Sequence, residues 1–553
     1  MAVRTFGEIV YEDKEYLLRV EPHVAIMLKA IFPQIPKTQT GTLKIKDKEG
    51  IASELIWFMD RYPLKISEEC TELLKRDDQL HKDLVAKRES ILLPDYVPTI
   101  TQMKKPLRPY QEMWVDFIDL SKRGLNADWA GLGKTPQALG LAARGKLPMA
   151  IFVKKHLKKQ WVEKILEFTD LRPHIVRTRK AYNLPLADIF IFTYGKAVGW
   201  VDLFQTGFFK AVVYDEIQEL RRDESVKYKA CRVASKNAEY SVGLSATPVQ
   251  NYAIDIYNVL DLISPGCLGD RGDFVREWFG YGKITMDPDA LGSFIKEKHL
   301  MVRRTRADVG RDLPPTNIIN DTVETDEKAY ESHTAMAKTL ATRALHGRFD
   351  EAGRSLRELD IMVRQATGIA KAKGVAEYVK ILLESGEQVV LFGWHRKVYE
   401  IWLEELKDFA PAMYTGTESE AQKKKNADSF IRGESRVLIM SLASGEGLDG
   451  LQHLDSCSTV VFGELDWSGE KHKQCIWRVE RDGSQKQTTA IFLTCDEGSD
   501  PPMVELLGLK AAQAKGVMDP GKGPERVHSD DSRLKMLAKA ILAKKTGQEE
   551  SDD

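Results

Sequence analysis

The chain has 553 residues, of which 43% are hydrophobic and 29% charged, enough for roughly three to four domains of about 150 residues each. Its 81 basic and 82 acidic residues leave a net charge of -1, which excludes strong long-range attraction to nucleic acid or a membrane surface. The six cysteines form no C-x-x-C pair, and no stretch reaches the roughly 18 apolar residues of a membrane span. We therefore expect a globular, multidomain, cytoplasmic protein of a reducing compartment, which binds any polyanion through local patches.

Residues 1–100 are predicted to form a small accessory domain, either α/β or rich in helix. The segment 51–67 places Ile51, Leu55 and Phe58 at helical spacing, and a charged helix is expected to follow it. Four prolines between residues 94 and 109 prevent a continuous helix and indicate an extended linker. A domain boundary is therefore expected near residue 105.

Short apolar runs alternate with helical patterns from residue 105 to 320, and again from 376 to 505. These runs are predicted to be buried strands of parallel sheets, at 149–155, 188–194, 211–216 and 240–246 in the first series and 388–394, 435–441, 458–464 and 488–494 in the second. Residues 321–375 are charged and helix-favouring, which predicts a helical connection or protrusion. Residues 506–553 are expected to hold a C-terminal helix and a disordered acidic tail. The fold class is therefore α/β, with two tandem lobes of parallel sheet flanked by helices.

A phosphate-binding loop is indicated by the segment DWAGLGKT, residues 128–135. Gly131 and Gly133 allow backbone N–H groups to ring the phosphates, Lys134 can reach the β/γ oxygens, and the Thr135 hydroxyl can ligate Mg²⁺. Asp128 stands where the strict spacing has its first glycine, so the segment taken alone also fits a glycine-rich turn between a strand and a helix.

The acids Asp215 and Glu216, which end a predicted strand, favour the nucleotide-binding interpretation. A carboxylate at the carboxyl end of a strand can hold Mg²⁺, and its neighbour can polarise the attacking water. Together with the glycine-rich loop in the same lobe, the two acids indicate an ATP site.

In their order along the chain, these segments and their flanks resemble the motifs of the SWI/SNF-type branch of superfamily II helicases and translocases, over about residues 105 to 500. The similar segments are LRPYQ (107–111), WAGLGKT (129–135), DEIQ (215–218), GLSATPVQN (243–251), MVRRTRADV (301–309) followed by Leu313, Pro314 and Pro315, SLASGEGLD (441–449), and Asp466 and Trp467 ahead of QCIWRVERDG (474–483). The resemblance implies two RecA-like lobes, ATP and Mg²⁺ as cofactors, and DNA bound mostly through its backbone. Residues 371–379 and the N-terminal domain look most like the compact annealing-helicase, fork-remodelling subgroup.

The resemblance also implies roles for single residues. Gln111 would contact the adenine edge, Lys134, Asp215 and Glu216 would be catalytic, and Thr135 and Asp215 would hold Mg²⁺. On a helix Gln474, Arg478 and Arg481 share one face, so they can point across an interlobe cleft toward the γ-phosphate, where an arginine neutralises developing charge. The residues implied to couple the phosphate site to the DNA track are Gln218, Ser245, Thr247 and Asp449. Gln218, where the family usually has His, and Glu446, in the glycine-rich turn, depart from the family pattern.

Lysines follow the predicted strands at the edge expected to meet DNA. Lys154 and Lys155 belong to the run KKHLKK before Trp161, and Thr193 and Lys196 follow the next strand. Such residues suit phosphate contacts with little sequence specificity. Trp161 is expected to pack rather than to stack on a base. The run 423–425 fits a DNA-facing helix and a solvated helix face equally well.

The leading hypothesis is an ATP-dependent DNA translocase or helicase that acts on duplex or branched DNA in replication, recombination or repair. One alternative is an RNA helicase. Others are a nucleic-acid binding module with a degenerate motor and a protein-remodelling ATPase, in which the N-terminal domain would bind a protein partner. The compact length and the lack of recognisable chromatin-reading modules favour a bacterial or viral source.

Overall fold

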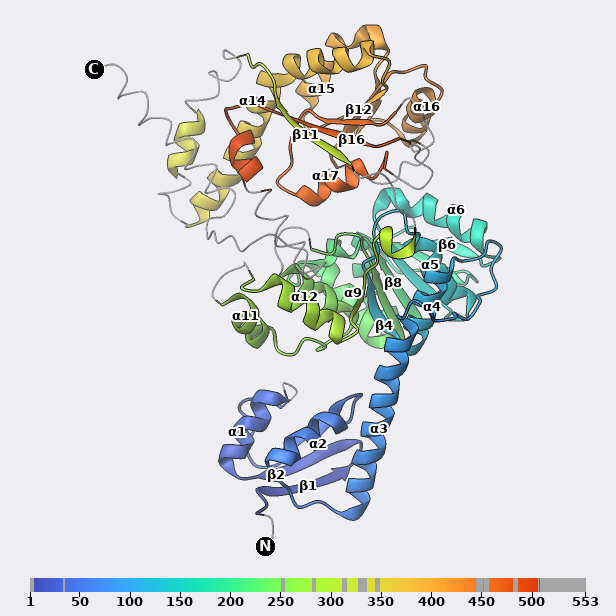
Figure 1. The fold of residues 1–553 in the computed structure, drawn as a ribbon, viewed down its shortest axis with the longest axis vertical. Helices are drawn as coiled ribbons and strands as arrows, with labels where there is room; N and C mark the ends of the chain where they lie inside the picture. Colours follow the sequence, from blue (N-terminus) through green and yellow to red (C-terminus); the bar gives the residue numbers. More distant parts are fainter. Residues whose placement is uncertain are drawn as a thin grey trace, which may run out of the picture.

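The computed structural model describes residues 4–32, 35–249, 254–280, 285–310, 316–326, 336–343, 349–443, 451, 457–480, 486–505 and 507. Over these residues the chain forms three units that follow one another along its longest axis (Figure 1). The predicted C-terminal helix and acidic tail lie outside the described residues, except for Leu507. Among the described helices, none has the combination of length and apolar character that crossing a membrane requires.

The N-terminal unit is an antiparallel sheet, of strand order β1-β2-β3, covered by helices. Its elements are β1 (Gly7–Glu12), β2 (Glu15–Val20), α1 (Pro22–Ile31), β3 (Leu43–Lys46), α2 (Ile51–Arg61) and α3 (Glu68–Ile91). Tyr16, Leu18 and Phe58 are buried in its core. The sequence predicts α2 and α3 but does not place the strands, because short half-buried strands carry a weak periodic signal.

Helix α3 connects the N-terminal unit to the first lobe (Figure 1). It begins at Ser67, whose hydroxyl accepts a hydrogen bond from the Cys70 N–H at 3.1 Å. Near its other end, the guanidinium of Arg88 donates to Glu49 of the N-terminal unit and to the Ser121 hydroxyl of the first lobe, the latter at 3.1 Å. The helix therefore holds two units at a defined separation.

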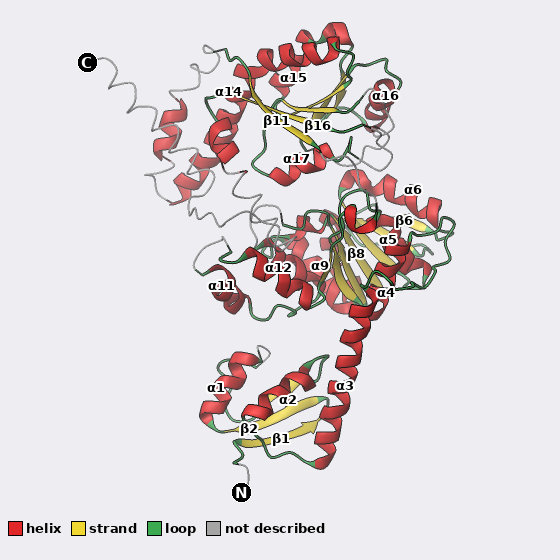
Figure 2. Cartoon of the chain, in the orientation of Figure 1, coloured by secondary structure: helices red, strands yellow, loops and turns green. Residues whose placement is uncertain are grey.

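The first lobe is a parallel sheet with helices on both faces (Figure 2). Within the described residues its strand order is β10-β4-β9-β8-β5-β7-β6. The strands are β4 (Arg123–Asn126), β5 (Met149–Val153), β6 (Pro173–Ile175), β7 (Ile189–Thr193), β8 (Ala211–Asp215), β9 (Tyr240–Leu244) and β10 (Met301–Val302). The helices are α4 (Pro109–Ser121), α5 (Lys134–Ala143), α6 (Lys158–Phe168), α7 (Tyr194–Ala197), α8 (Val201–Gln205), α9 (Val226–Asn237), α10 (Asp255–Ile263), α11 (Arg271–Phe279) and α12 (Pro288–Glu297), with 3-10 turns at Lys155–Leu157, Val198–Trp200, Ile217–Leu220 and Ala307–Val309.

The second lobe is also a parallel sheet with helices around it. Its strand order over the described residues is β11-β16-β15-β12-β14-β13. Its elements are β11 (Asn317–Thr322), α14 (Phe349–Glu384), β12 (Val389–Gly393), α15 (Arg396–Glu405), a 3-10 turn (Lys407–Phe409), β13 (Ala412–Tyr414), α16 (Glu420–Ile431), β14 (Val437–Ser441), β15 (Thr459–Phe462), α17 (Gly469–Ile476) and β16 (Thr489–Thr494). The predicted fold class, two tandem RecA-like lobes with a small N-terminal domain, is confirmed.

Two expected boundaries differ from the structure. Residue 320 falls inside β11, which pairs with β16 and so belongs to the second sheet. Residue 375 falls inside α14, which continues from the expected connection into the second lobe. The strand β11 is largely exposed at a sheet edge and is held by backbone hydrogen bonds, so its side chains give no alternating signal.

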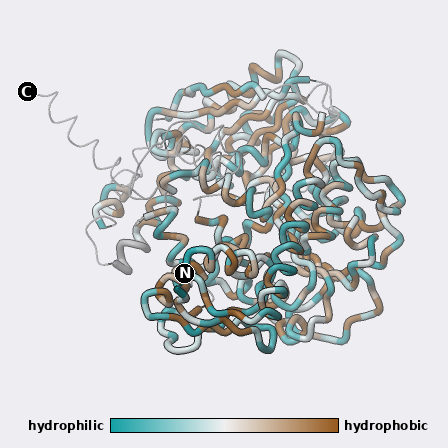
Figure 3. Tube along the Cα trace, turned by 60° about the horizontal axis from the view of Figure 1, so that its bottom comes forward, coloured by the Kyte–Doolittle hydropathy of each residue, from teal (hydrophilic) through white to brown (hydrophobic). Residues whose placement is uncertain are grey.

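Each central sheet carries apolar side chains on both faces, as parallel sheets do. In the first lobe, β5 and β9 are buried along their whole length, and two apolar clusters flank the sheet. The second lobe has two clusters of its own. Hydrophobic and hydrophilic stretches alternate along the trace in Figure 3. Because each lobe has its own core, the lobes can move as separate bodies.

Candidate active site between the two lobes

The phosphate loop connects β4 to α5 at the carboxyl edge of the first sheet. Gly131 and Gly133 have φ angles of 85° and 75°, a left-handed region that glycine adopts without steric cost. Gly133 precedes the first turn of α5, so unpaired backbone N–H groups of that turn are available to an anion. The Nζ of Lys134 donates to the Asp128 carbonyl at 2.8 Å and to the Trp129 carbonyl at 3.3 Å, so the lysine lies along the loop.

Three carboxylates lie close enough to Lys134 to affect its titration. Burial lowers the pKa of Lys134, while the negative charges of Asp128, Glu216 and Asp215 oppose that change. Asp215 ends β8 and Glu216 follows it in a left-handed conformation, with φ of 53°. A non-glycine residue in this region stores backbone strain, as is common at functional sites. The structure therefore brings together the predicted catalytic residues Lys134, Asp215 and Glu216.

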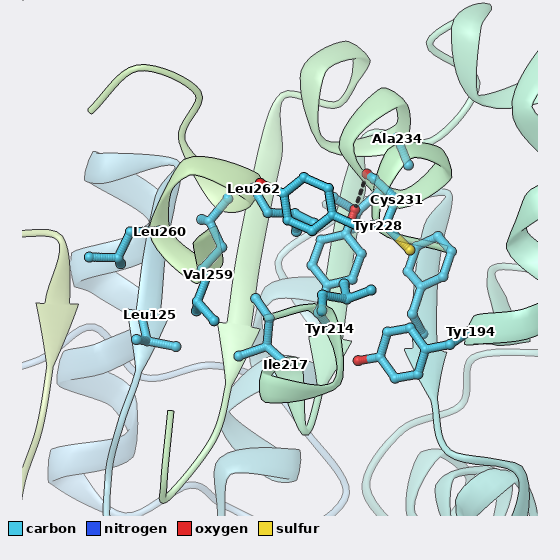
Figure 4. Packing of buried hydrophobic residues seen from close by; sticks show 14 of the residues in the cluster. Leu125, Tyr194, Tyr214, Ile217, Tyr228, Cys231, Ala234, Val259, Leu260 and Leu262 are labelled. Atoms are coloured by element: carbon cyan, nitrogen blue, oxygen red, sulfur yellow. Dashed lines mark hydrogen bonds between the residues drawn. The ribbon is translucent and has the colours of Figure 1, made fainter. Parts of the chain in front are cut away.

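Aromatic side chains hold the end of β8 in place. The Trp161 indole Nε1 donates to Asp215 Oδ2 at 2.7 Å, and the Tyr194 hydroxyl donates to the Asp215 carbonyl at 2.5 Å. Tyr214 is anchored by a hydrogen bond from its hydroxyl to the Cys231 carbonyl at 2.8 Å (Figure 4). Trp161 is 2% exposed and packs in the core, as expected, but its hydrogen bond to the candidate metal ligand has no signal in the sequence.

Asp128 is fully buried and forms an ion pair with Arg304 from the RRTR segment. The Nε and Nη2 of Arg304 donate to the two carboxylate oxygens of Asp128 at 3.0 and 2.6 Å, and Gln137 Nε2 donates to Asp128 Oδ2 at 3.1 Å. Asp128 replaces a P-loop glycine, and here it fastens the phosphate loop to the segment that leads toward the second lobe. Sequence reasoning missed Arg304, whose only signal is its place in a run of arginines.

Gln111 lies against the phosphate loop. It is 6% exposed, its Oε1 accepts from the Arg108 N–H at 2.9 Å and its Nε2 donates to the Leu132 carbonyl at 3.0 Å. A Cβ atom on Gly133 would collide with the Gln111 amide, so the loop and this side chain are fitted to each other. The expected contact of Gln111 with adenine stays a prediction.

The residues predicted to couple ATP to DNA form two contacts. Gln218 is fully buried and its Nε2 donates to Glu216 Oε2. The Ser245 hydroxyl accepts from the Thr247 N–H at 3.0 Å, next to the end of β9. Asp449 lies outside the described residues.

The two lobes meet through α17 and the segment that follows it. Gln474 Nε2 donates to the Thr247 hydroxyl at 3.3 Å. Arg306 Nη1 contacts Glu480 Oε1 at 3.0 Å, and its Nη2 donates to the Glu480 carbonyl at 2.8 Å and to the Ala130 carbonyl of the phosphate loop at 3.4 Å. The side chains of Arg306 and Glu480 are 8% and 12% exposed, so this ion pair is weakly screened by water. Gln474 and its neighbours therefore face the nucleotide site from the second lobe.

Of the two predicted arginines, only Arg478 lies among the described residues. Arg478 is partly buried, one turn beyond α17, and its N–H donates to the Cys475 carbonyl at 3.1 Å. Arg481 lies outside the described residues. Arg478 follows Gln474 by four residues, which places both on one side of a helical turn.

The donor set fits ATP and Mg²⁺. Thr135 is the second residue of α5 and offers a hydroxyl, Asp215 offers a carboxylate, and oxygen donors are those Mg²⁺ prefers. Over the described residues, no group of three His, Cys, Asp or Glu side chains could hold a metal by itself.

A pocket of about 460 Å³ lies at the carboxyl edge of the first sheet and is strongly basic. Its lining residues are Val153, Lys154, Lys155, Lys158, Thr193, Tyr194, Gly195, Lys196, Glu219 and Lys227. Burial lowers the pKa of Lys196, and the positive charges of Lys158 and Lys155 lower it further. Burial opposes ionisation of Glu219, but Lys154 and Lys227 outweigh it, so the pKa of Glu219 is lowered. The predicted nucleic-acid residues Lys154, Lys155 and Thr193 thus share one pocket.

The run 423–425 lies on α16. The side chain of Lys423 is 15% exposed, its Nζ lies 3.5 Å from Glu420 and 5.6 Å from the centre of the Tyr414 ring, while Lys424 and Lys425 are exposed. Lys423 therefore packs on its own lobe, and the other two lysines remain open to solvent or to DNA.

Two family models match the chain, an SNF2-related domain over residues 53–368 and a helicase conserved C-terminal domain over residues 371–483. The chain is 26% identical over 441 residues to a SWI/SNF-related matrix-associated actin-dependent regulator of chromatin subfamily A-like protein 1 from Xenopus tropicalis, covering 76% of this chain and 46% of that protein. It is 22% identical over 480 residues to the uncharacterized ATP-dependent helicase YqhH from Bacillus subtilis, covering 79% and 83%. The human DNA annealing helicase and endonuclease ZRANB3 shares 23% identity over 461 residues, covering 76% and 41%.

The chain thus spans less than half the length of its Xenopus and human relatives. Among solved structures, a Sulfolobus solfataricus SWI2/SNF2 ATPase core in complex with dsDNA aligns with a TM-score of 0.39 and 19% identity, over 77% of this chain and 96% of that one.

Proposed function

This chain belongs to the SNF2-related family, and we propose that it is an ATPase that couples ATP hydrolysis to movement along DNA. The observation that carries the proposal is the meeting of the two lobes at the phosphate loop. Arg306 joins the Ala130 carbonyl to Glu480, and Gln474 contacts Thr247. A site assembled from two separately folded lobes opens and closes with each nucleotide cycle, which is what converts hydrolysis into motion.

The first lobe would bind and activate the substrate. Backbone N–H groups around Gly131 and Gly133 and the Lys134 ammonium would hold the phosphates. Thr135 and Asp215 would hold Mg²⁺, which neutralises phosphate charge when it is bound. Glu216, whose Oε2 accepts from Gln218 Nε2, would orient the attacking water.

The second lobe would complete the site on closure. Arg478 and Arg481 would approach the γ-phosphate, where an arginine accelerates phosphoryl transfer by about 10³ to 10⁵-fold in related chemistry. The hydrogen bond from Gln474 Nε2 to the Thr247 hydroxyl, 3.3 Å in this structure, would connect closure of the lobes to the residues predicted to couple ATP to DNA.

The basic pocket would bind the DNA backbone. Burial and the positive charges of Lys158 and Lys155 lower the pKa of Lys196, so a phosphate in the pocket would relieve the repulsion among these lysines. Lys154, Lys155 and Thr193 would contact phosphates without reading bases. The human relative described above is named a DNA annealing helicase, which favours DNA over RNA as the track.

The preferred substrate is proposed to be branched duplex DNA, as the name of the annealing-helicase relative suggests. The N-terminal unit, joined to the first lobe by α3 and by the ion pair of Lys37 with Asp273, is proposed as the element that directs the motor to its target, whether that is a DNA junction or a protein partner.

The test is steady-state ATP hydrolysis without nucleic acid and with duplex, single-stranded and forked DNA and RNA. We expect stimulation by duplex or forked DNA, abolished by Glu216→Gln and weakened by the double variant Lys154→Ala/Lys155→Ala. Lys407→Ala is a matched control, because this exposed lysine of the second lobe lies outside the basic pocket. Stimulation by RNA alone would support the RNA helicase instead, and nucleotide binding without turnover would support a binding module.

A further inference from the structure

Two tryptophans meet across the boundary between the lobes. Trp129 belongs to the phosphate loop of the first lobe, and Trp477 directly follows α17 in the second. Their ring centroids lie 6.5 Å apart and their planes are inclined by 38°, within the range of favourable aromatic pairs. The two rings therefore form an apolar contact beside the polar interlobe contacts.

The Trp129 backbone is fixed to the phosphate loop. Its N–H donates to the Arg304 carbonyl at 3.0 Å, and its carbonyl accepts from the Lys134 Nζ at 3.3 Å. The guanidinium carbon of Arg303 lies 5.9 Å from the centre of the Trp129 ring, and Arg303 Nη1 donates to the Ala127 carbonyl at 3.0 Å. The hydrogen bonds to Arg304 and Lys134 use the Trp129 backbone, so removing the indole leaves them in place.

Every third residue from 474 to 480 contacts the first lobe, and Trp477 is the middle one of the three. Gln474 contacts Thr247, Trp477 contacts Trp129, and Glu480 contacts Arg306. A spacing of three residues keeps side chains on one side of a helical turn, so one face of this segment is turned toward the first lobe. Arg478 directly follows Trp477, so the position of the indole constrains that of the arginine.

Neither tryptophan belongs to the apolar clusters of the described lobes. The Trp129 Nε1 atom is buried and has no hydrogen-bond partner among the described residues, so the ring is positioned by its contacts with Trp477 and Arg303 and not by a hydrogen bond. A buried donor without a partner costs free energy, and a ring kept at that cost outside any core points to a role in the interface.

We propose that Trp129 and Trp477 act as an interlobe clasp, a pair of positioning residues that hold the segment carrying Arg478 against the phosphate loop when the lobes are closed. This rests on the proposed ATPase function. The flanking hydrogen bond and ion pair fix the direction of the α17 segment, and the indoles exclude water from the contact, which strengthens both. Opening the lobes separates the rings, so the clasp favours the state in which hydrolysis occurs.

The clasp predicts that loss of either tryptophan changes kcat more than it changes the KM for ATP. Trp129→Ala or Trp477→Ala is expected to lower kcat with saturating duplex DNA by about two- to tenfold, the range for loss of one aromatic pair. The KM for ATP should change less than kcat, because the phosphate loop and Lys134 remain. Trp477→Phe keeps an aromatic ring and should retain most of the turnover. Trp57→Ala, which removes an indole 60% exposed on α2, is the matched control and should leave kcat unchanged.

The double variant Trp129→Ala/Trp477→Ala decides whether the rings act as a pair. We expect its kcat to match that of the worse single variant, because either change already removes the contact. Losses that multiply would show that the two residues act independently and would overturn the clasp. Unchanged kcat in both single variants would also overturn it.

Hydrogen exchange gives a readout that needs no activity. In Trp129→Ala, peptides over residues 469–480 of the second lobe should exchange faster, although the altered residue lies in the first lobe. Unchanged exchange there would refute the contact. If the wild type turns over ATP and these peptides do not respond, the clasp alone fails. If the peptides respond but no nucleic acid stimulates turnover, the proposed function fails.

Discussion

Replacing Arg304 with alanine is expected to destabilise the phosphate-loop region by about 3–5 kcal/mol, the usual cost of removing one partner of a buried ion pair. Asp128 is fully buried and the Arg304 side chain is 14% exposed. Arg304 Nε and Nη2 contact the two carboxylate oxygens at 3.0 and 2.6 Å. Gln137 Nε2, at 3.1 Å, and the backbone N–H of residue 304, at 3.0 Å, would remain, but two neutral donors do not offset a buried charge.

The assay is native-state hydrogen exchange over residues 123–143, because a chain with several structural units has no single unfolding free energy. Exchange of these amides should accelerate by roughly 10²- to 5 × 10³-fold in Arg304→Ala. The affinity for ATP should fall as well, because Lys134 donates to the carbonyl of Asp128 at 2.8 Å and the loop would shift with that residue.

The matched control is Arg172→Ala. Arg172 also contacts both oxygens of one carboxylate, with Nε and Nη2 at 3.0 and 2.9 Å from Asp188, but its side chain is 56% exposed. Water screens an exposed pair, so no measurable change in exchange is expected around it. If Arg304→Ala accelerated exchange no more than Arg172→Ala does, burial of the Asp128 pair would not matter, and our account of the loop would be refuted.

Three further predictions concern pH, backbone geometry and metal. Burial lowers the pKa of the His472 ring, whose Nε2 accepts from the Asp466 N–H, to about 4. Because this folded-state pKa is below the unfolded value, the second lobe has its full stability above about pH 6.5 and loses about 3 kcal/mol as the pH drops toward 4. In urea denaturation across that pH range, His472→Gln should reduce the loss. Gly133→Ala should weaken ATP binding at least tenfold, because an alanine with φ of 75° is strained and its Cβ would meet the Gln111 amide. The control is Gly145→Ala, where φ is 77° but the space around the residue is open. Equal ATP affinities of the two variants in a nucleotide titration would contradict the steric argument. Removal of Mg²⁺ by EDTA should abolish ATP turnover and excess Mg²⁺ should restore it, whereas turnover that persists in EDTA would exclude Thr135 and Asp215 as metal ligands.

The sequence was informative wherever chemistry depends on residues close together in the chain. The strands β5, β7, β8 and β9 are buried along nearly their whole length, so their apolar runs are continuous and easy to locate. The phosphate loop depends on two glycines and a lysine within four residues, a spacing that the backbone geometry requires. The family resemblance followed from the order of such local motifs.

Edge strands and boundaries were harder to predict. The strand β11 is mostly exposed, and β10 has two residues, so neither carries a periodic pattern of useful length. Their place in a sheet is fixed by backbone hydrogen bonds to β16 and β4, distant parts of the chain. The sequence alone therefore placed residues 317–320 in the wrong lobe.

By itself, the sequence determined the fold class, the phosphate loop and the acids at the end of β8, because local spacing and burial pattern carry that information. Only the tertiary structure decided what these residues touch: Trp161 on Asp215, Arg304 on Asp128, and Trp477 on Trp129. Each pair joins residues that are far apart in the chain. A tryptophan or arginine gives the same signal in the sequence whether its side chain packs in a core or contacts a residue of the candidate site. The partner of such a side chain is set by how the sheets and lobes pack, which no local pattern records.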